Sequence, residues 1–143
     1  MATVSVSKHI NVPVEKGWEK LLDLPTWEEW LTLHVSWKGD LPTRIEEGTR
    51  LTEVVSVMGM ANKIEWTVEE LEEQSRVKIS GTGMAAVKVS IDFSIKPDGD
   101  GSEVEIEAGF SGAMIVGPIG TAVGKAAQKD LDESIDKFAA LVG

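Results

Sequence analysis

Cysteine and tyrosine are absent from this chain of 143 residues, and histidine occurs only as His9 and His34. The lack of cysteine excludes disulfides, thiolate metal sites and cysteine nucleophiles. No spacing of His, Asp and Glu resembles a zinc site or a calcium loop, and there is no G-x-S-x-G elbow for a serine nucleophile. We therefore expect no metal and no cofactor, and we assign no catalytic residue.

Basic residues are scarce, with 14 Lys and Arg against 24 Asp and Glu, for a net charge of −10. A negative field of this size repels phosphate backbones and anionic lipid headgroups. No window approaches the ~20 apolar residues of a membrane span, and the N-terminal segment MATVSVSKHI lacks the pattern of a secretory signal. The sequence predicts a cytoplasmic protein that binds no nucleic acid and does not insert stably into a membrane.

The composition is that of a globular protein, with 42% apolar and 27% charged residues, and the length suits one domain over residues 1–143. Strand-like alternation of apolar and polar residues occurs in seven segments, at 3–10, 31–39, 49–58, 62–71, 75–83, 86–97 and 102–112. Helical patterns occupy residues 12–24, 25–31 and 118–142.

The alternation is clearest in the sixth strand segment, where Val89, Ile91 and Phe93 alternate with polar residues. A sheet built this way has one dry face and one wet face. Only the C-terminal helix, about 37 Å long at 1.5 Å per residue, can cover the dry face. The sequence therefore predicts an α+β fold. In it a curved, seven-stranded antiparallel sheet grips a long C-terminal helix on its concave face, and two short helices follow the first strand.

The first half of the C-terminal helix is built from small residues, among them Gly120 and Gly124, although glycine costs a helix about 1 kcal/mol relative to alanine. Large residues follow only after Lys129. The expected inward stripe is Ile119, Val123, Ala127, Leu131, Ile135, Phe138 and Val142. Either the small residues let helix and sheet approach closely, or the sheet holds the helix away and leaves an apolar cavity beneath its first half.

Several N-terminal positions carry a resemblance to a known superfamily, namely Ile10, Val12, Pro13, Val14, Trp18, Asp23 and Trp30, followed by the segment EEGTRL. Together with the order of elements, they resemble the START-like superfamily, which includes polyketide cyclases/dehydrases, lipid-transport domains and pollen-allergen-like ligand carriers. The resemblance implies a helix-grip fold with a deep hydrophobic pocket between sheet and C-terminal helix. The sequence is also similar to an actinobacterial branch whose members are labelled toxins of toxin–antitoxin pairs.

The resemblance favours the cavity and places Trp27 and Trp30 by its mouth. Trp30, Trp37 and Trp66 either line the pocket or pack in the core. The candidate ligand-binding residues are Trp30, Val35, Trp37, Ile64, Trp66, Val89, Ile91, Phe93, Ile106, Phe110, Ile119, Val123 and Ala127.

Polar and flexible side chains near the pocket leave further alternatives. If Leu33, Val35 and Trp37 face inward, His34 is exposed; a one-residue slip would turn it into the pocket as a candidate general base. Glu53 and Glu65 are expected on the surface, with entry into the pocket as a lone acid as the alternative for either. Met58 is expected to be core filler, while Met60 and Met84 are either filler or parts of an adaptable ligand site.

The function predicted from the sequence is binding or carriage of a small hydrophobic ligand, such as a lipid, a polyketide or an aromatic metabolite. One alternative is a cyclase or dehydratase that uses His34 or Glu65, although the scarcity of histidine and the lack of tyrosine and cysteine count against an enzyme. The other is a protein-interaction module with an exposed apolar patch around Trp27, Trp30 and Leu33.

Overall fold

The computed structural model describes residues 2–83, 86–113 and 115–143. Its elements follow one another as β1 (Ala2–Ile10), α1 (Val14–Leu21), the 3-10 turn η1 (Leu24–Thr26), α2 (Trp27–Trp30), β2 (His34–Lys38), β3 (Arg50–Val57), β4 (Met60–Glu72), β5 (Arg76–Thr82), β6 (Lys88–Asp98), β7 (Gly101–Ser111) and α3 (Gly117–Val142). The predicted order of elements is confirmed. The helix predicted over 25–31 is divided into η1 and α2.

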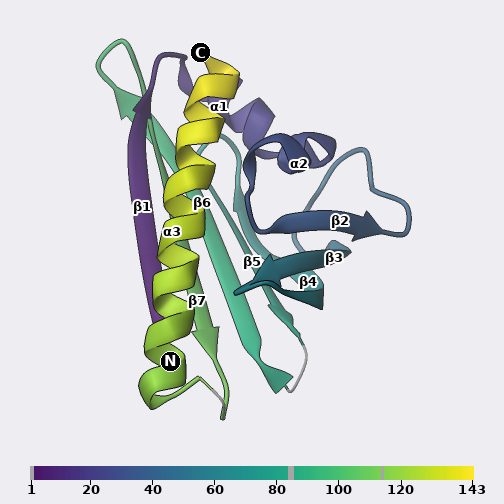
Figure 1. Cartoon of the computed structure of the whole chain (residues 1–143). Helices are drawn as coiled ribbons and strands as arrows, with labels where there is room; N and C mark the ends of the chain where they lie inside the picture. Colours follow the sequence, from purple (N-terminus) through teal and green to yellow (C-terminus); the bar gives the residue numbers. More distant parts are fainter. Residues whose placement is uncertain (1, 84–85, 114) are drawn as a thin grey trace.

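The seven strands form one antiparallel sheet in the order β1-β7-β6-β5-β4-β3-β2. From β2 onward each strand pairs with the next in the chain, and β1 completes the sheet by pairing with β7. The sheet curls into a half-barrel, and α3 lies along β1 on its concave side (Figure 1). The α+β helix-grip architecture predicted from the sequence is therefore present.

The concave face of the sheet carries the core. On β6 the buried side chains are Val89, Ile91, Phe93 and Ile95, and the intervening residues are polar and partly or fully exposed. The second half of α3 packs onto this face through Leu131, Ile135 and Phe138, all nearly inaccessible to solvent. Alternation with a period of two thus produces the dry face as expected.

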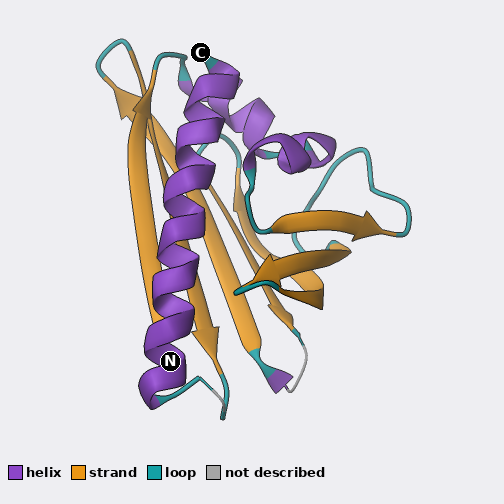
Figure 2. Ribbon diagram, in the orientation of Figure 1, coloured by secondary structure: helices purple, strands orange, loops and turns teal. Residues whose placement is uncertain are grey.

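The short helices close one end of the half-barrel, beside the C-terminal half of α3 (Figure 2). Trp30 of α2 packs against Phe138 of α3 with ring centroids 4.9 Å apart, and Trp27 lies 5.4 Å from Phe93 of β6. These ring contacts join α2, α3 and the sheet into one aromatic cluster at this end. No helix in the described part of the chain is long and apolar enough to cross a membrane.

Candidate ligand-binding site

A β-bulge in β2 determines which of its side chains enter the concave face. His34 pairs with Val55 and Trp37 pairs with Glu53, so three steps along β2 match two along β3. The extra residue of the bulge lies between His34 and Ser36, at Val35. The Val35 side chain points outward and is 52% exposed. The prediction that Val35 faces inward is wrong, because it assumed strict alternation along a strand that contains a bulge.

The bulge brings His34 and Glu53 together as a buried pair, with side chains only 2% and 1% exposed. His34 Nδ1 and Glu53 Oε2 share a short hydrogen bond, and Trp66 Nε1–H donates to Glu53 Oε1 at 2.9 Å. The expectation that His34 is exposed is wrong, and the inward alternative is realised. Within the described ranges, no three His, Asp or Glu side chains are arranged to hold a metal ion.

Glu53 is the functional candidate that the sequence prediction misplaced. It is fully buried, whereas Glu65 is exposed as expected. The missed signal was its place in the segment LTEVV, where Glu53 shares the inward parity of Leu51 and Val55. A charged residue at an inward position of an alternating strand is unusual, and buried ionisable groups gather at functional sites.

Indole rings form the wall beside this pair. Trp37 packs 5.1 Å from the His34 ring and 5.3 Å from Trp27, and its Nε1–H donates to the carbonyl of Leu24 at 3.0 Å. Trp30 Nε1 is buried and has no hydrogen-bond partner among the described residues. The concave face is thus apolar and aromatic around a single acid–base pair.

The first half of α3 is less buried than the second. Ala122, Val123, Gly124 and Ala126 are half-buried, and Ile119 is 53% exposed, so the prediction that Ile119 faces inward is wrong. A Cβ added at Gly124 would meet only the Cβ of Ala2, at an ordinary 3.8 Å. Gly124 is therefore not required for close packing, and the cavity beneath this half of α3 stays a prediction.

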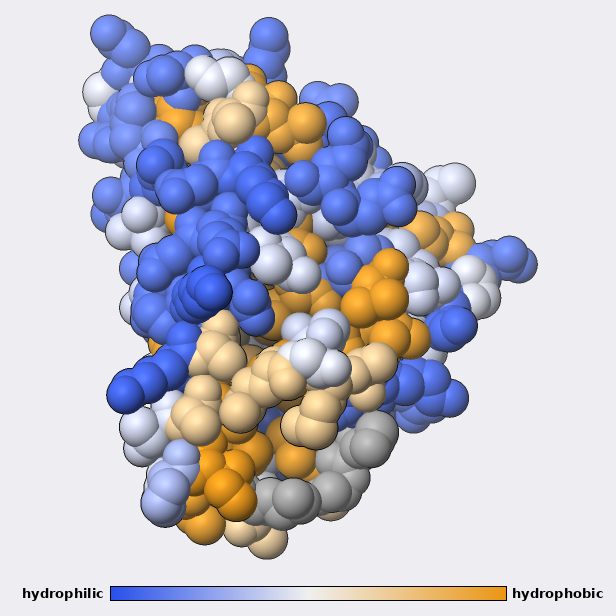
Figure 3. Space-filling view, in the orientation of Figure 1, coloured by the Kyte–Doolittle hydropathy of each residue, from blue (hydrophilic) through white to orange (hydrophobic). Residues whose placement is uncertain are grey.

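The side of α3 that carries Ile119, Val123 and Asp130 faces away from β1, since Gln128 on the opposite side bonds to the Ser5 carbonyl. Burial, followed by the charge of Glu133, raises the pKa of the Asp130 carboxyl. Figure 3 shows apolar surface beside the first half of α3 and hydrophilic surface along much of its second half. This apolar flank is a candidate entrance to the cavity predicted beneath the helix.

The β3–β4 turn presents two methionines to solvent, Met58 at 51% and Met60 at 67% exposed. The expectation that Met58 fills the core is wrong, because it lies at the tip of the turn with a positive φ. Met84 lies outside the described residues. Exposed thioethers are adaptable apolar contacts, so the turn is a second candidate edge of the entrance.

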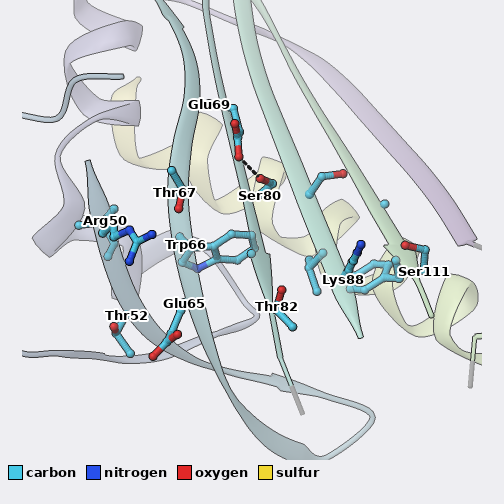
Figure 4. Close-up of a pocket in the computed structure, with 16 residues that line it drawn as sticks. Arg50, Thr52, Glu65, Trp66, Thr67, Glu69, Ser80, Thr82, Lys88 and Ser111 are labelled. Atoms are coloured by element: carbon cyan, nitrogen blue, oxygen red, sulfur yellow. Dashed lines mark hydrogen bonds between the residues drawn. The ribbon is translucent and has the colours of Figure 1, made fainter. Parts of the chain in front are cut away.

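A hollow of about 720 Å³ lies on the opposite, outer face of the sheet (Figure 4). Its lining combines outward polar residues, as in the cross-strand row of Thr52, Glu65, Thr82, Lys88 and Ser111, with the apolar residues Leu51, Trp66, Val89 and Phe110. Because the outward row carries charged side chains, this surface suits an apolar ligand less well than the concave face does.

Elsewhere on the outer face, Asp92 accepts hydrogen bonds from Arg76 Nε and Nη2 at 2.9 and 2.6 Å. This contact raises the pKa of the Arg76 guanidinium. Because the pair is partly exposed and screened by solvent, we regard it as part of the wet face and assign it little stability.

Most of the predicted ligand-binding residues do lie on the inner side. The buried ones are Trp30, Ile64, Trp66, Val89, Ile91, Phe93, Ile106, Phe110 and Ala127, and Trp37 and Val123 are half-buried. Their role in binding stays a prediction. The exposed apolar patch around Trp27, Trp30 and Leu33 that would have supported the protein-interaction alternative is not found, because all three residues are buried.

Comparison with known proteins places this geometry in a family. Over 138 residues the chain is 35% identical to Toxin Rv0910 of Mycobacterium tuberculosis, covering 96% of each protein. It is 29% identical over its full length to the uncharacterised protein Rv1546 of the same organism.

Solved structures share the fold at low sequence identity. A START superfamily protein of Mycobacterium smegmatis aligns with a TM-score of 0.77 at 20% identity, covering 99% of this chain and 97% of that one. A protein of Thermus thermophilus aligns with a TM-score of 0.79 at 19% identity, covering 98% of this chain and 96% of that one.

The family model described as polyketide cyclase / dehydrase and lipid transport matches residues 1–143, the whole chain. With its curled sheet, gripped helix and aromatic concave face, the chain belongs to the polyketide cyclase/dehydrase and lipid transport family.

Proposed function

We propose that this protein binds and carries a small hydrophobic ligand, such as a lipid, a polyketide or an aromatic metabolite, between the concave face of the sheet and α3. The observation that carries the proposal is the composition of this face, which is mainly apolar and aromatic, with the buried His34–Glu53 pair as its ionisable groups. Ligand pockets typically combine such a wall with one or two placed polar groups. The family description, which includes lipid transport, supports the same ligand class.

Apolar contact would supply most of the affinity. Removal of apolar surface from water contributes about 25 cal/mol per Å², so burial of roughly 200 Å² contributes about 5 kcal/mol. A hydrogen bond adds about 1 kcal/mol and fixes the orientation. The ligand therefore needs to be mainly apolar.

We place the entrance between the first half of α3 and the β3–β4 turn. Ile119 and Val123 supply apolar atoms from the helix, and Met58 and Met60 supply them from the turn. α3 also approaches β3. In this account, small outward movement of the helix start admits the ligand, since few buried contacts hold it there.

Enlarging Val123 is expected to block uptake. Val123→Trp places an indole at the half-buried flank of α3 and should weaken binding of the neutral fluorescent probe N-phenyl-1-naphthylamine at least tenfold, which corresponds to about 1.4 kcal/mol. Probe fluorescence titration measures the effect. Native mass spectrometry of freshly purified wild type should also show an apolar adduct that Val123→Trp lacks.

Gly124→Ala is the matched control, one position along the same helix. Its new methyl meets only the Ala2 methyl, and the helix gains up to about 1 kcal/mol of propensity. Probe binding should stay at the wild-type level. Equal probe affinity in wild type and Val123→Trp would contradict the proposed entrance, and no binding by wild type would contradict the proposed function.

A cyclase or dehydratase is the second candidate, because His34 and Glu53 place an acid–base pair on the apolar face. A change in the mass of a bound ligand after incubation would separate catalysis from carriage. The name of the relative Toxin Rv0910 also motivates a protein partner for this chain. Such a partner would meet the exposed methionines of the β3–β4 turn, since the Trp27, Trp30 and Leu33 side chains are buried.

A further inference from the structure

Burial of the His34–Glu53 pair costs the fold solvation free energy. Two ionisable side chains, 2% and 1% exposed, lie on a face otherwise made of apolar residues. Charges removed from water lose several kcal/mol of solvation each, and well-packed apolar residues of similar size often serve stability equally well. Stability alone therefore does not account for the pair.

The hydrogen bonds of Glu53 fix the tautomer of His34. A carboxylate only accepts hydrogen bonds, and its Oε1 already receives the Trp66 indole N–H. When Glu53 is a carboxylate, its Oε2 accepts from His34 Nδ1, which then carries the imidazole proton. In the neutral ring, Nε2 is then left with its lone pair as an acceptor.

That acceptor has no protein partner, since Nδ1 makes the only hydrogen bond of the His34 side chain among the described residues. The centroid of the Trp37 ring lies 5.1 Å from that of the imidazole ring, and Val55 is the partner of His34 in the pairing of β2 with β3. Trp66 orients Glu53, Glu53 orients His34, and Nε2 forms the free end of this relay. A base held by an orienting carboxylate is the arrangement that presents a nitrogen lone pair to a bound molecule.

We propose that His34 Nε2 recognises the ligand by accepting a hydrogen bond from its hydroxyl group, with Glu53 and Trp66 as positioning residues. This inference rests on the proposed function and narrows the ligand class. The ligand is an apolar ring compound with an acidic hydroxyl, that is, a phenol or an enol. The aromatic side chains pack against the ring of the ligand, and His34 Nε2 accepts a hydrogen bond from its hydroxyl group.

The test compares 1-naphthol with 1-methoxynaphthalene, which has the same ring system but no hydroxyl hydrogen. At pH 8, above the ordinary imidazole pKa of about 6.5, wild type should bind 1-naphthol about tenfold more tightly, the effect of one net hydrogen bond. In protein labelled with ¹⁵N-histidine, 1-naphthol should shift the Nε2 signal of His34. The methyl ether should leave this signal in place, and His9, exposed on β1, serves as the internal control.

Glu53→Gln tests the relay without changing its shape. The single amide oxygen of the introduced glutamine would accept from Trp66, so its NH₂ would face His34 Nδ1 and force the proton onto Nε2. The preference for 1-naphthol should fall to about threefold or less, while the methyl ether still binds. Glu65→Gln, on the exposed face of β4, should keep the wild-type preference.

The possible outcomes separate the two proposals. Equal affinity of wild type for both compounds, or an Nε2 signal that 1-naphthol does not shift, overturns the role of His34 and leaves the proposed function standing. Binding of neither compound overturns both. The wild-type measurements decide the question even if Glu53→Gln does not fold.

Discussion

Replacing Trp30 with alanine is expected to lower the free energy of unfolding by about 3–5 kcal/mol, a large part of the stability of a domain this size. The side chain is 1% exposed and packs edge-on against Phe138 of α3, with further contacts to Trp27 and Phe93. Its removal would leave a cavity where α2, α3 and the sheet meet. Urea denaturation followed by circular dichroism measures the loss.

Trp30→Phe separates packing from hydrogen bonding at the same position. Because Trp30 Nε1 has no partner in the described part of the chain, phenylalanine gives up no hydrogen bond and loses only part of the ring volume. We expect Trp30→Phe to lower the free energy of unfolding by about 1–2 kcal/mol. If the phenylalanine variant were as unstable as the alanine variant, the N–H rather than the ring would be the stabilising group, and the account of the aromatic cluster would be wrong.

The second large effect is expected for the His34–Glu53 pair. His34→Leu leaves the Glu53 carboxylate buried with one fewer partner, and Glu53→Leu leaves two buried N–H donors unpaired, on His34 and Trp66. The free energy of unfolding of each single variant should fall by roughly 3 kcal/mol. The double variant should also lose no more than about 3 kcal/mol of unfolding free energy, because both ionisable side chains are then gone.

A double-mutant cycle in urea measures this coupling. The predicted interaction energy is about 3 kcal/mol, the excess of the two single losses over the double loss. Thr52→Val is a suitable control, because Thr52 is next to Glu53 on β3 and its side chain lies on the outer face of the sheet. Its change in the free energy of unfolding should add to that of either single variant. Additive losses for His34 and Glu53 would mean that the two side chains do not act as a pair.

The long, regular elements were predictable because local rules and packing agree there. On β6 the strict alternation from Val89 to Ile95 makes the buried face unambiguous. The Gly117-Pro118 pair starts α3 at the predicted position, because proline fits a first helical turn. The fold class followed from these elements and from the length of α3.

The site was less predictable, because it depends on a bulge. A single extra residue in β2 reverses the expected orientations of His34 and Val35, and the sequence HVSWK carries no glycine that would mark it. Pairing with β3 determines where the bulge falls, and pairing is a tertiary property. Glu53 is buried although a carboxylate favours solvent, because its position in the alternation of β3 places it with Leu51 and Val55.

The space beneath α3 depends on the distance between a helix and a curved sheet. Small residues at Ala122 and Gly124 permit both close approach and separation, so side-chain size does not define this distance. The structure adds that Gly124 has room for a methyl group and that Val123 is half-buried. Both observations support the proposed site.

The most direct test of a ligand on the concave face uses the five tryptophan indole N–H signals in ¹H–¹⁵N spectra. Titration with N-phenyl-1-naphthylamine should shift the signal of Trp37, which packs against the His34 ring, and leave Trp18, whose Nε1 donates to Glu73 at 3.3 Å beyond this site. Shifts confined to backbone amides of the outer-face hollow, such as Thr82 and Ser90, would place the ligand on the wrong side of the sheet and contradict the account.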